Sequence, residues 1–153
     1  MRSYFAEFVG TATVATVVIG SGIMAESLSK DVGVQLLINA ASTGAALWIL
    51  ITLLAPVSGA HFNPVVTGIA LIRKDLKAQA ALFYLVAQTF GAIAGTIVAN
   101  LLYQHPAIDI SSKNRDGGNL LLSEVIATAG LVFLIYQLSA LDKKSIVPAG
   151  VSL

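Results

Sequence analysis

One apolar segment of this chain is too short to cross a lipid bilayer, although the segments before and after it are long enough. Residues 63–72 supply about ten residues, roughly half of what a helix needs to cross about 30 Å of hydrocarbon. The turn-forming run 58–62 (Ser-Gly-Ala-His-Phe) precedes them. Non-helical backbone is tolerated at membrane depth only where protein or a water-filled cavity satisfies its polar groups. The pattern therefore predicts a re-entrant half-helix, which enters the membrane partway and returns to the same face.

The surrounding sequence is typical of an all-α membrane protein. Hydrophobic residues make up 56% of the 153-residue chain, and charged residues make up 11%. Four apolar segments have spanning length, at residues 4–24, 35–56, 78–103 and 120–140. A fifth is predicted to begin near Ile146 and is cut at Leu153. We expect the first segment to be a retained helix, because it lacks a convincing signal-peptide cleavage region.

The polar composition argues against several classes of function. A net charge of +1 gives no support to nucleic-acid binding. The chain has no cysteine, and His61 and His105 are too far apart in sequence to form a metal-ligand motif. The spans carry no nucleophile motif, acid–base pair or phosphate loop. We therefore expect no enzymatic activity, no cofactor and no metal site.

Basic residues near the span ends predict the orientation in the membrane. If the four spans alternate and the half-helix returns to its own face, six basic residues lie on the side of the N-terminus: Arg2, Arg73, Lys74, Lys77, Lys143 and Lys144. Three lie on the other side, where acidic residues outnumber them: Lys30, Lys113 and Arg115. We therefore expect a multi-pass protein of the inner (plasma) membrane, with a cytoplasmic N-terminus and an external connection at residues 104–119.

A short motif recurs in inverted orientation. Residues 6–11 (Ala-Glu-Phe-Val-Gly-Thr) recur as residues 123–128 (Ser-Glu-Val-Ile-Ala-Thr), each early in a span. Three spans separate the copies, and an odd number inverts the second relative to the first. The sequence thus predicts an inverted repeat, with residues 1–118 as the first copy and 119–153 as the beginning of the second. Because a complete copy would need roughly another hundred residues, we expect a fragment or truncated gene product; two short chains that meet to form a pore are the alternative.

The half-helix and the third span carry a family resemblance. Residues 58–67 (Ser-Gly-Ala-His-Phe-Asn-Pro-Val-Val-Thr) resemble the first pore loop of the aquaporin and glycerol-channel family, the major intrinsic proteins, with Val65 where that family usually has alanine. Residues 87–95 resemble its Ala-Gln-x-x-Gly-Ala-x-x-Gly motif, in which Gly91 and Gly95 also predict close helix packing. The resemblance implies an aquaporin-like inverted-repeat helical bundle that passes water or small neutral solutes through a lipid bilayer, and a homotetramer for the full-length protein.

The chemistry of residues 58–67 predicts a site that orients an uncharged, hydrogen-bonding molecule. Small residues would let the backbone run extended, so that successive carbonyls line a path. Asn63 supplies an amide with two donors, and Pro64 suits the first helical turn because its missing N–H would have no partner there. The half-helix N-terminus adds a partial charge of about +0.5, which disfavours cations. The predicted pore residues are Gly59, Ala60, His61, Phe62, Asn63, Pro64 and Val65, with the His61 ring structural and only its carbonyl facing the path.

Further roles follow from acidic residues within the spans and from the resemblance. An intramembrane carboxyl is a functional hypothesis by default; for Glu7 and Glu124, near the span starts, snorkelling to the interface is the alternative. The resemblance implies that both glutamates, with Gln88, brace re-entrant loops through hydrogen bonds. It also places Thr43, twenty positions before Asn63, in the outer selectivity filter. Because water-selective members have an aromatic residue there, we expect a wider filter that passes larger uncharged solutes.

The solute remains open among water, glycerol and metalloid hydroxides; residues 20–26 resemble a bacterial branch associated with arsenic-resistance loci, which implies the last of these. Two other functions remain. An inverted-repeat secondary transporter would also use a broken helix, but these spans hold few charged groups. An inactive membrane fragment would result if the loop lacked an opposing loop, because unsatisfied polar groups in hydrocarbon cost several kcal/mol each. We therefore expect the chain alone to be unstable or inactive without a second half.

Overall fold

The computed structural model describes residues 1–110 and 117–140, and all secondary-structure elements in these ranges are α-helices. They are α1 (Arg2–Leu28), α2 (Val32–Ser58), α3 (Pro64–Ile72), α4 (Ala78–Leu102) and α5 (Gly118–Ala140). Among them α1, α2, α4 and α5 are long and apolar enough to cross a membrane, whereas α3 has only nine residues. The predicted all-α bundle of four spans and one half-helix is confirmed. The predicted fifth span lies outside the described residues.

Helix boundaries differ from the predicted ones where capping residues decide them. The Asp31 side chain caps α2 by accepting hydrogen bonds from Gly33 N at 2.7 Å and Val34 N at 3.1 Å, so α2 begins three residues earlier than predicted. At the other end α2 continues past Pro56, where the prediction ended it. It ends at Ser58, and the residue that follows, Gly59, has a φ of 87°, a left-handed conformation that glycine adopts without steric cost.

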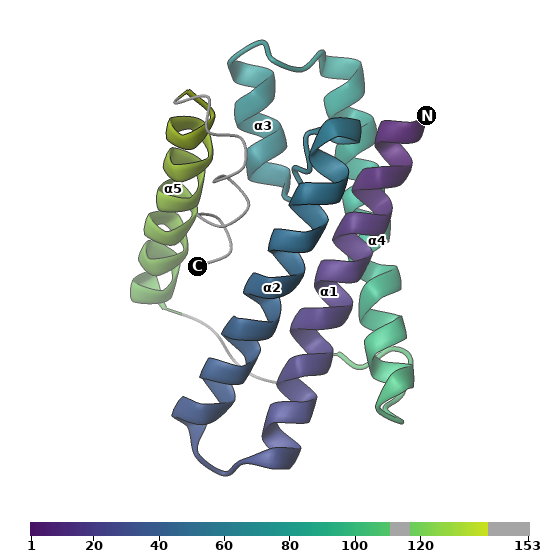
Figure 1. Ribbon diagram of the computed structural model, residues 1–153, viewed down its shortest axis with the longest axis vertical. Coiled ribbons are helices and arrows are strands. Elements are labelled where there is room, and N and C mark those ends of the chain that lie inside the picture. Colours follow the sequence, from purple (N-terminus) through teal and green to yellow (C-terminus); the bar gives the residue numbers. More distant parts are fainter. Residues whose placement is uncertain (111–116, 141–153) are drawn as a thin grey trace.

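The half-helix α3 begins inside the bundle. Figure 1 shows α2 ending at the same end of the molecule as the N-terminus, after which the chain turns back among the helices. From there α3 runs out again to that end, where α4 begins. This is the path that the short apolar segment predicts for a re-entrant half-helix. It places the N-terminus of α3 partway along its longer neighbours, and places Arg73, Lys74 and Lys77 near the end that carries Arg2.

Helices α1 and α4 approach so closely that only glycine fits at two positions of α4. A Cβ atom at Gly91 would lie 2.5 Å from Phe8 O, and one at Gly95 would lie 2.1 Å from Ala12 O. The Thr16 hydroxyl bridges the same contact, at 3.0 Å from Gly95 O. The packing role predicted for these two glycines is confirmed. Since α1 also packs against α2, it forms the centre of the described bundle.

Candidate functional site

The carboxylate of Glu7 on α1 holds the loop between α2 and α3 (residues 59–63, called the loop below). Glu7 is fully buried. Its Oε1 accepts hydrogen bonds from Ser58 Oγ at 2.6 Å and His61 N at 3.0 Å. Its Oε2 accepts from Phe62 N at 2.8 Å and Gln88 Nε2 at 2.8 Å. Four donors from α2, the loop and α4 thus meet at one carboxylate, which gives the buried charge the hydrogen bonds that it requires.

Helix α4 fixes the loop from a second side. Besides Glu7, Gln88 Nε2 reaches Thr67 Oγ1 of α3 at 2.9 Å, and the same hydroxyl lies 3.1 Å from His61 Nδ1. The Tyr84 hydroxyl, one turn before Gln88, donates to Ser58 O at 2.7 Å. The His61 ring is therefore held by a hydrogen bond to Thr67. Thr67 and Tyr84 were not predicted; the four-residue spacing of Tyr84 and Gln88 on one helix face was the available signal.

The Phe62 ring lies directly on the backbone of α1. A Cβ atom built at Gly10 would lie 2.0 Å from Phe62 Cε1, so any side chain at position 10 would displace the ring. Gly10 is buried within the motif at residues 6–11, but the pattern there gave no indication of this contact. The contact fixes the depth of the loop relative to α1.

The predicted extended backbone of the loop is wrong. Gly59, Ala60 and Phe62 have φ values of 87°, 50° and 47°, all in the left-handed region. Glycine adopts this region freely, whereas each of the other two pays about 1–2 kcal/mol. The bonds from His61 N and Phe62 N to Glu7 require this path of the chain and offset its cost. The loop thus turns tightly into the bundle where the prediction had it extended.

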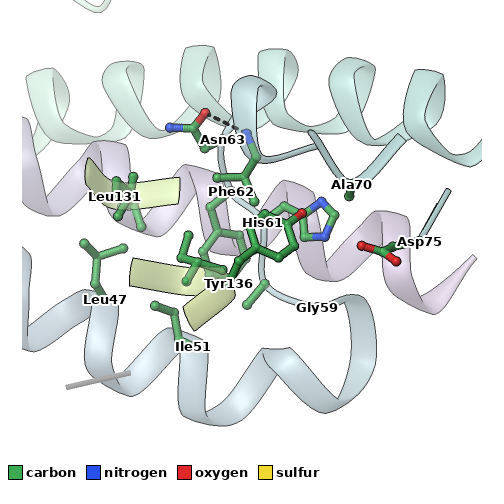
Figure 2. Close-up of a pocket in the computed structure, with 14 residues that line it drawn as sticks. Leu47, Ile51, Gly59, His61, Phe62, Asn63, Ala70, Asp75, Leu131 and Tyr136 are labelled. Carbon is green, nitrogen blue, oxygen red and sulfur yellow. Dashed lines mark hydrogen bonds between the residues drawn. The ribbon is translucent and has the colours of Figure 1, made fainter. Parts of the chain in front are cut away.

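The carbonyl oxygens of loop residues 59–62 have no partner in the part of the chain that the structure describes. In the described part of the chain no group donates a hydrogen bond to these four oxygens. All four residues line a cavity of about 370 Å³ (Figure 2). The remaining wall is largely apolar and comes from four helices, with Val14, Leu47, Ile51, Val66, Ala70, Leu131 and Ile135. The loop therefore lines one side of a cavity whose other walls are largely apolar.

Asn63 has two hydrogen-bonding functions in this site. Its Oδ1 caps α3 by accepting from Val65 N at 2.7 Å and Val66 N at 3.4 Å, and Pro64 occupies the first helical position. Its Nδ2 donates to no group among the described residues, and Asn63 lines the cavity. Figure 2 shows this nitrogen on the opposite side of the amide from the capping bond. Pro64 and Val65 do not line this cavity.

Two predicted residues lie away from the loop. Thr43 shares a face of α2 with Leu47 and Ile51 at four-residue spacing, one turn beyond the cavity toward the α1–α2 connection. Its Oγ1 is buried and has no hydrogen-bond partner in the ranges that the structure describes. Glu124 is exposed on α5 and lines a second, mostly apolar cavity of about 650 Å³ together with Val65. The structure thus brings Glu7 and Gln88 to the loop, but not Glu124.

Comparisons with known proteins identify a single family. The family model for Major intrinsic protein matches residues 1–151. An aquaglyceroporin of Rhizobium meliloti (strain 1021) is 43% identical over 134 residues, which cover 88% of this chain and 58% of the relative. Aquaporin-5 of Ovis aries is 31% identical over 155 residues (98% and 56%), and aquaporin TIP2-1 of Arabidopsis thaliana is 28% identical over 149 residues (94% and 60%). The chain therefore spans less than two-thirds of the length of these relatives.

Proposed function

Because this chain belongs to the major intrinsic protein family, whose members are membrane channels rather than enzymes, we propose that it forms part of a path for water and small uncharged solutes. It provides one half of this path and the start of the other half. The observation that carries the proposal is that, within residues 1–110 and 117–140, no group donates to the carbonyls of residues 59–62 and none accepts from Asn63 Nδ2, while all five residues line one cavity. A solute that both donates and accepts hydrogen bonds exchanges its water partners for these groups. A cation meets the positive end of α3 instead. Neither a secondary transporter nor an inactive fragment is favoured by the comparisons.

The solutes that we propose are larger than water. Thr43 is small and polar, and it lies on the α2 face that continues from the cavity wall. A relative that is 43% identical bears the name aquaglyceroporin. Glycerol-sized polyols are therefore the first candidates, with metalloid hydroxides as the second.

The proposal includes the arrangement of the whole protein. Residues 1–118 form the first repeat and residues 119–153 begin the second, with Glu124 in the position that braces a second loop. The protein lies in the plasma membrane with a cytoplasmic N-terminus, because basic residues gather at the end of the bundle that carries Arg2. The full-length protein assembles as a homotetramer.

Solute flux through reconstituted vesicles tests the function. The 153-residue chain is joined to the part of the Rhizobium meliloti aquaglyceroporin that lies beyond the matched region, and vesicle swelling in glycerol is followed by stopped-flow light scattering. We expect swelling faster than that of empty vesicles, and little flux from the 153-residue chain alone. A joined protein that is folded and inserted, yet leaves glycerol permeability at the level of empty vesicles, would falsify the proposal.

Substitutions of Asn63 in the joined protein separate its two functions. Asn63→Asp keeps an acceptor for the cap of α3 but removes both amide donors, so we expect normal stability and a decrease in glycerol flux of about fivefold, since one hydrogen bond contributes about 1 kcal/mol. Asn63→Leu removes donors and acceptor, so it should also destabilise the protein by about 1 kcal/mol. Swelling and detergent unfolding are measured for both variants. Unchanged flux in the aspartate variant would exclude an orienting role for the amide.

Thr43→Phe tests the proposed filter position. A phenyl ring at this point narrows the path, and we expect glycerol permeability to fall by about tenfold while water permeability falls by less than about threefold. Swelling in a glycerol gradient and shrinking in a sucrose gradient give the two permeabilities. Leu47→Phe, on the same face but one turn closer to the loop, is the matched comparison. An equal reduction of both permeabilities by Thr43→Phe argues against the assignment.

A further inference from the structure

Three side chains meet at the cavity end near the α3–α4 connection, and we call them the mouth cluster: Arg73, Asp75 and Tyr136. Arg73 Nε lies 3.2 Å from Asp75 Oδ2, and the guanidinium carbon lies 4.3 Å from the centre of the Tyr136 ring on α5. Asp75 and Tyr136 both line the cavity that contains the loop. Figure 2 shows Asp75 and Leu131 at opposite ends of the lining. Asp75 therefore borders one end of the proposed path, and Tyr136 lies between Asp75 and Leu131 in this view.

The backbone holds this cluster in place. The connection after α3 is an ordered turn, in which Arg73 N donates to Ile69 O at 2.9 Å and Asp75 N donates to Ala70 O at 2.9 Å. Lys74 between them has a φ of 66°, as expected for the left-handed residue that ends a helix. Because Ala70 also lines the cavity, the turn ties Asp75 directly to the cavity wall.

Asp75 is the one charged side chain among the described residues that line this cavity. Its carboxylate and the Arg73 guanidinium are each about half exposed, at 53% and 55%, so the ion pair contributes little to stability. The charge of Asp75 matters more for the electrostatic potential in the cavity than for stability. An unpaired carboxylate at the entrance of a low-dielectric passage would concentrate cations there.

We propose that Arg73 and Tyr136 set the charge selectivity of this entrance: Arg73 neutralises Asp75, and the Tyr136 ring holds the guanidinium in position by a cation–π contact. The proposal rests on the path proposed above. It adds three residues that determine specificity for uncharged solutes at the end of the path nearest the N-terminus of the chain. Arg73 is the residue that cancels the charge, and Tyr136 is a positioning residue.

The absence of cysteine from the chain allows a direct test. Ala60→Cys introduces one thiol in the cavity wall of the joined protein, in which any cysteine of the added part is first replaced by serine, and this protein is reconstituted in vesicles or detergent. The rate of thiol modification is measured with a cationic reagent, 2-aminoethyl methanethiosulfonate, and with the neutral methyl methanethiosulfonate. The ratio of the two rates reports the local preference for cations and requires no solute flux. His105→Cys, exposed in the connection after α4, is the control thiol.

Charge variants are then combined with Ala60→Cys. Arg73→Gln leaves Asp75 unpaired, and we expect the cation-to-neutral ratio to rise by about three- to tenfold. Adding Asp75→Asn should return the ratio to the parent value. Tyr136→Phe should keep that value, since the ring alone makes the contact, whereas Tyr136→Leu should move the ratio toward that of Arg73→Gln. The ratio at His105→Cys should not change.

The outcomes separate the two proposals. If the Ala60→Cys thiol reacts but Arg73→Gln leaves the cation-to-neutral rate ratio unchanged, the role proposed for the mouth cluster is wrong. The proposed path is not affected by this outcome. A thiol that reacts with neither reagent shows that the cavity is closed to water, which overturns both proposals. Equal ratios for Tyr136→Phe and Tyr136→Leu overturn the positioning role of Tyr136.

Discussion

Glu7→Leu is expected to release the loop and to lower the free energy of unfolding by about 3–5 kcal/mol, because each buried donor that loses its acceptor costs about 1–3 kcal/mol and part of this cost is recovered as the loop relaxes. The substitution leaves four donors without their acceptor: Ser58 Oγ, His61 N, Phe62 N and Gln88 Nε2. The carboxylate is fully buried, so solvent does not reach this position in the intact bundle. Unfolding in mixed micelles, followed by circular dichroism and by the fluorescence of the single tryptophan, Trp48, measures the change.

Two variants control for this prediction. Glu26→Leu removes a carboxylate from the exposed end of the same helix, and it should change stability by less than about 0.5 kcal/mol. Glu7→Gln keeps one acceptor oxygen, so its free energy of unfolding should lie between those of the parent protein and Glu7→Leu. If Glu7→Leu were as stable as Glu26→Leu, the carboxylate would not hold the loop.

Gly95→Ala is expected to destabilise the bundle by about 1–3 kcal/mol, because one added methyl group must force two backbones apart. The new Cβ atom would lie 2.1 Å from Ala12 O, and a backbone oxygen cannot move aside as a flexible side chain would. The separation would also break the contact from Thr16 Oγ1 to Gly95 O. The same unfolding experiment measures the loss.

Gly68→Ala is the matched control for this substitution. It makes the same chemical change within a helix, but nothing lies within 4 Å of the added atom. Because alanine favours a helix over glycine, we expect stability to be unchanged or to increase by up to about 1 kcal/mol. Equal effects of the two substitutions would mean that α1 and α4 are not closely packed at Gly95.

Local signals in the sequence were sufficient to predict the helices and the half-helix. The spans have the length and composition that a bilayer requires, and Asn63-Pro64 combines a capping side chain with a residue suited to the first helical turn. The glycine spacing in α4 predicted close packing without identifying the partner, since Phe8 and Ala12 lie on another helix. Family membership, shown by the comparisons, was predicted from the loop and the third span.

The details of the site depend on contacts between distant residues. No local preference favours a left-handed backbone at Ala60 or Phe62, and the conformation arises from bonds to Glu7, 54 and 55 positions away from His61 and Phe62. The contact of Phe62 with Gly10 likewise depends on how α1 lies against the loop. The roles proposed for Thr43 and Glu124 rest on the resemblance, because neither side chain contacts the loop.

The distribution of donors around Glu7 has a consequence for biosynthesis. Three of the four belong to residues 58–62, which leave the ribosome soon after α1 and α2, whereas Gln88 follows only with α4. A nascent chain that consists of α1, α2 and the loop therefore already contains three of the four donors. Synthesis of α4 then supplies the fourth donor, Gln88, so three of the four bonds that anchor the loop do not depend on α4.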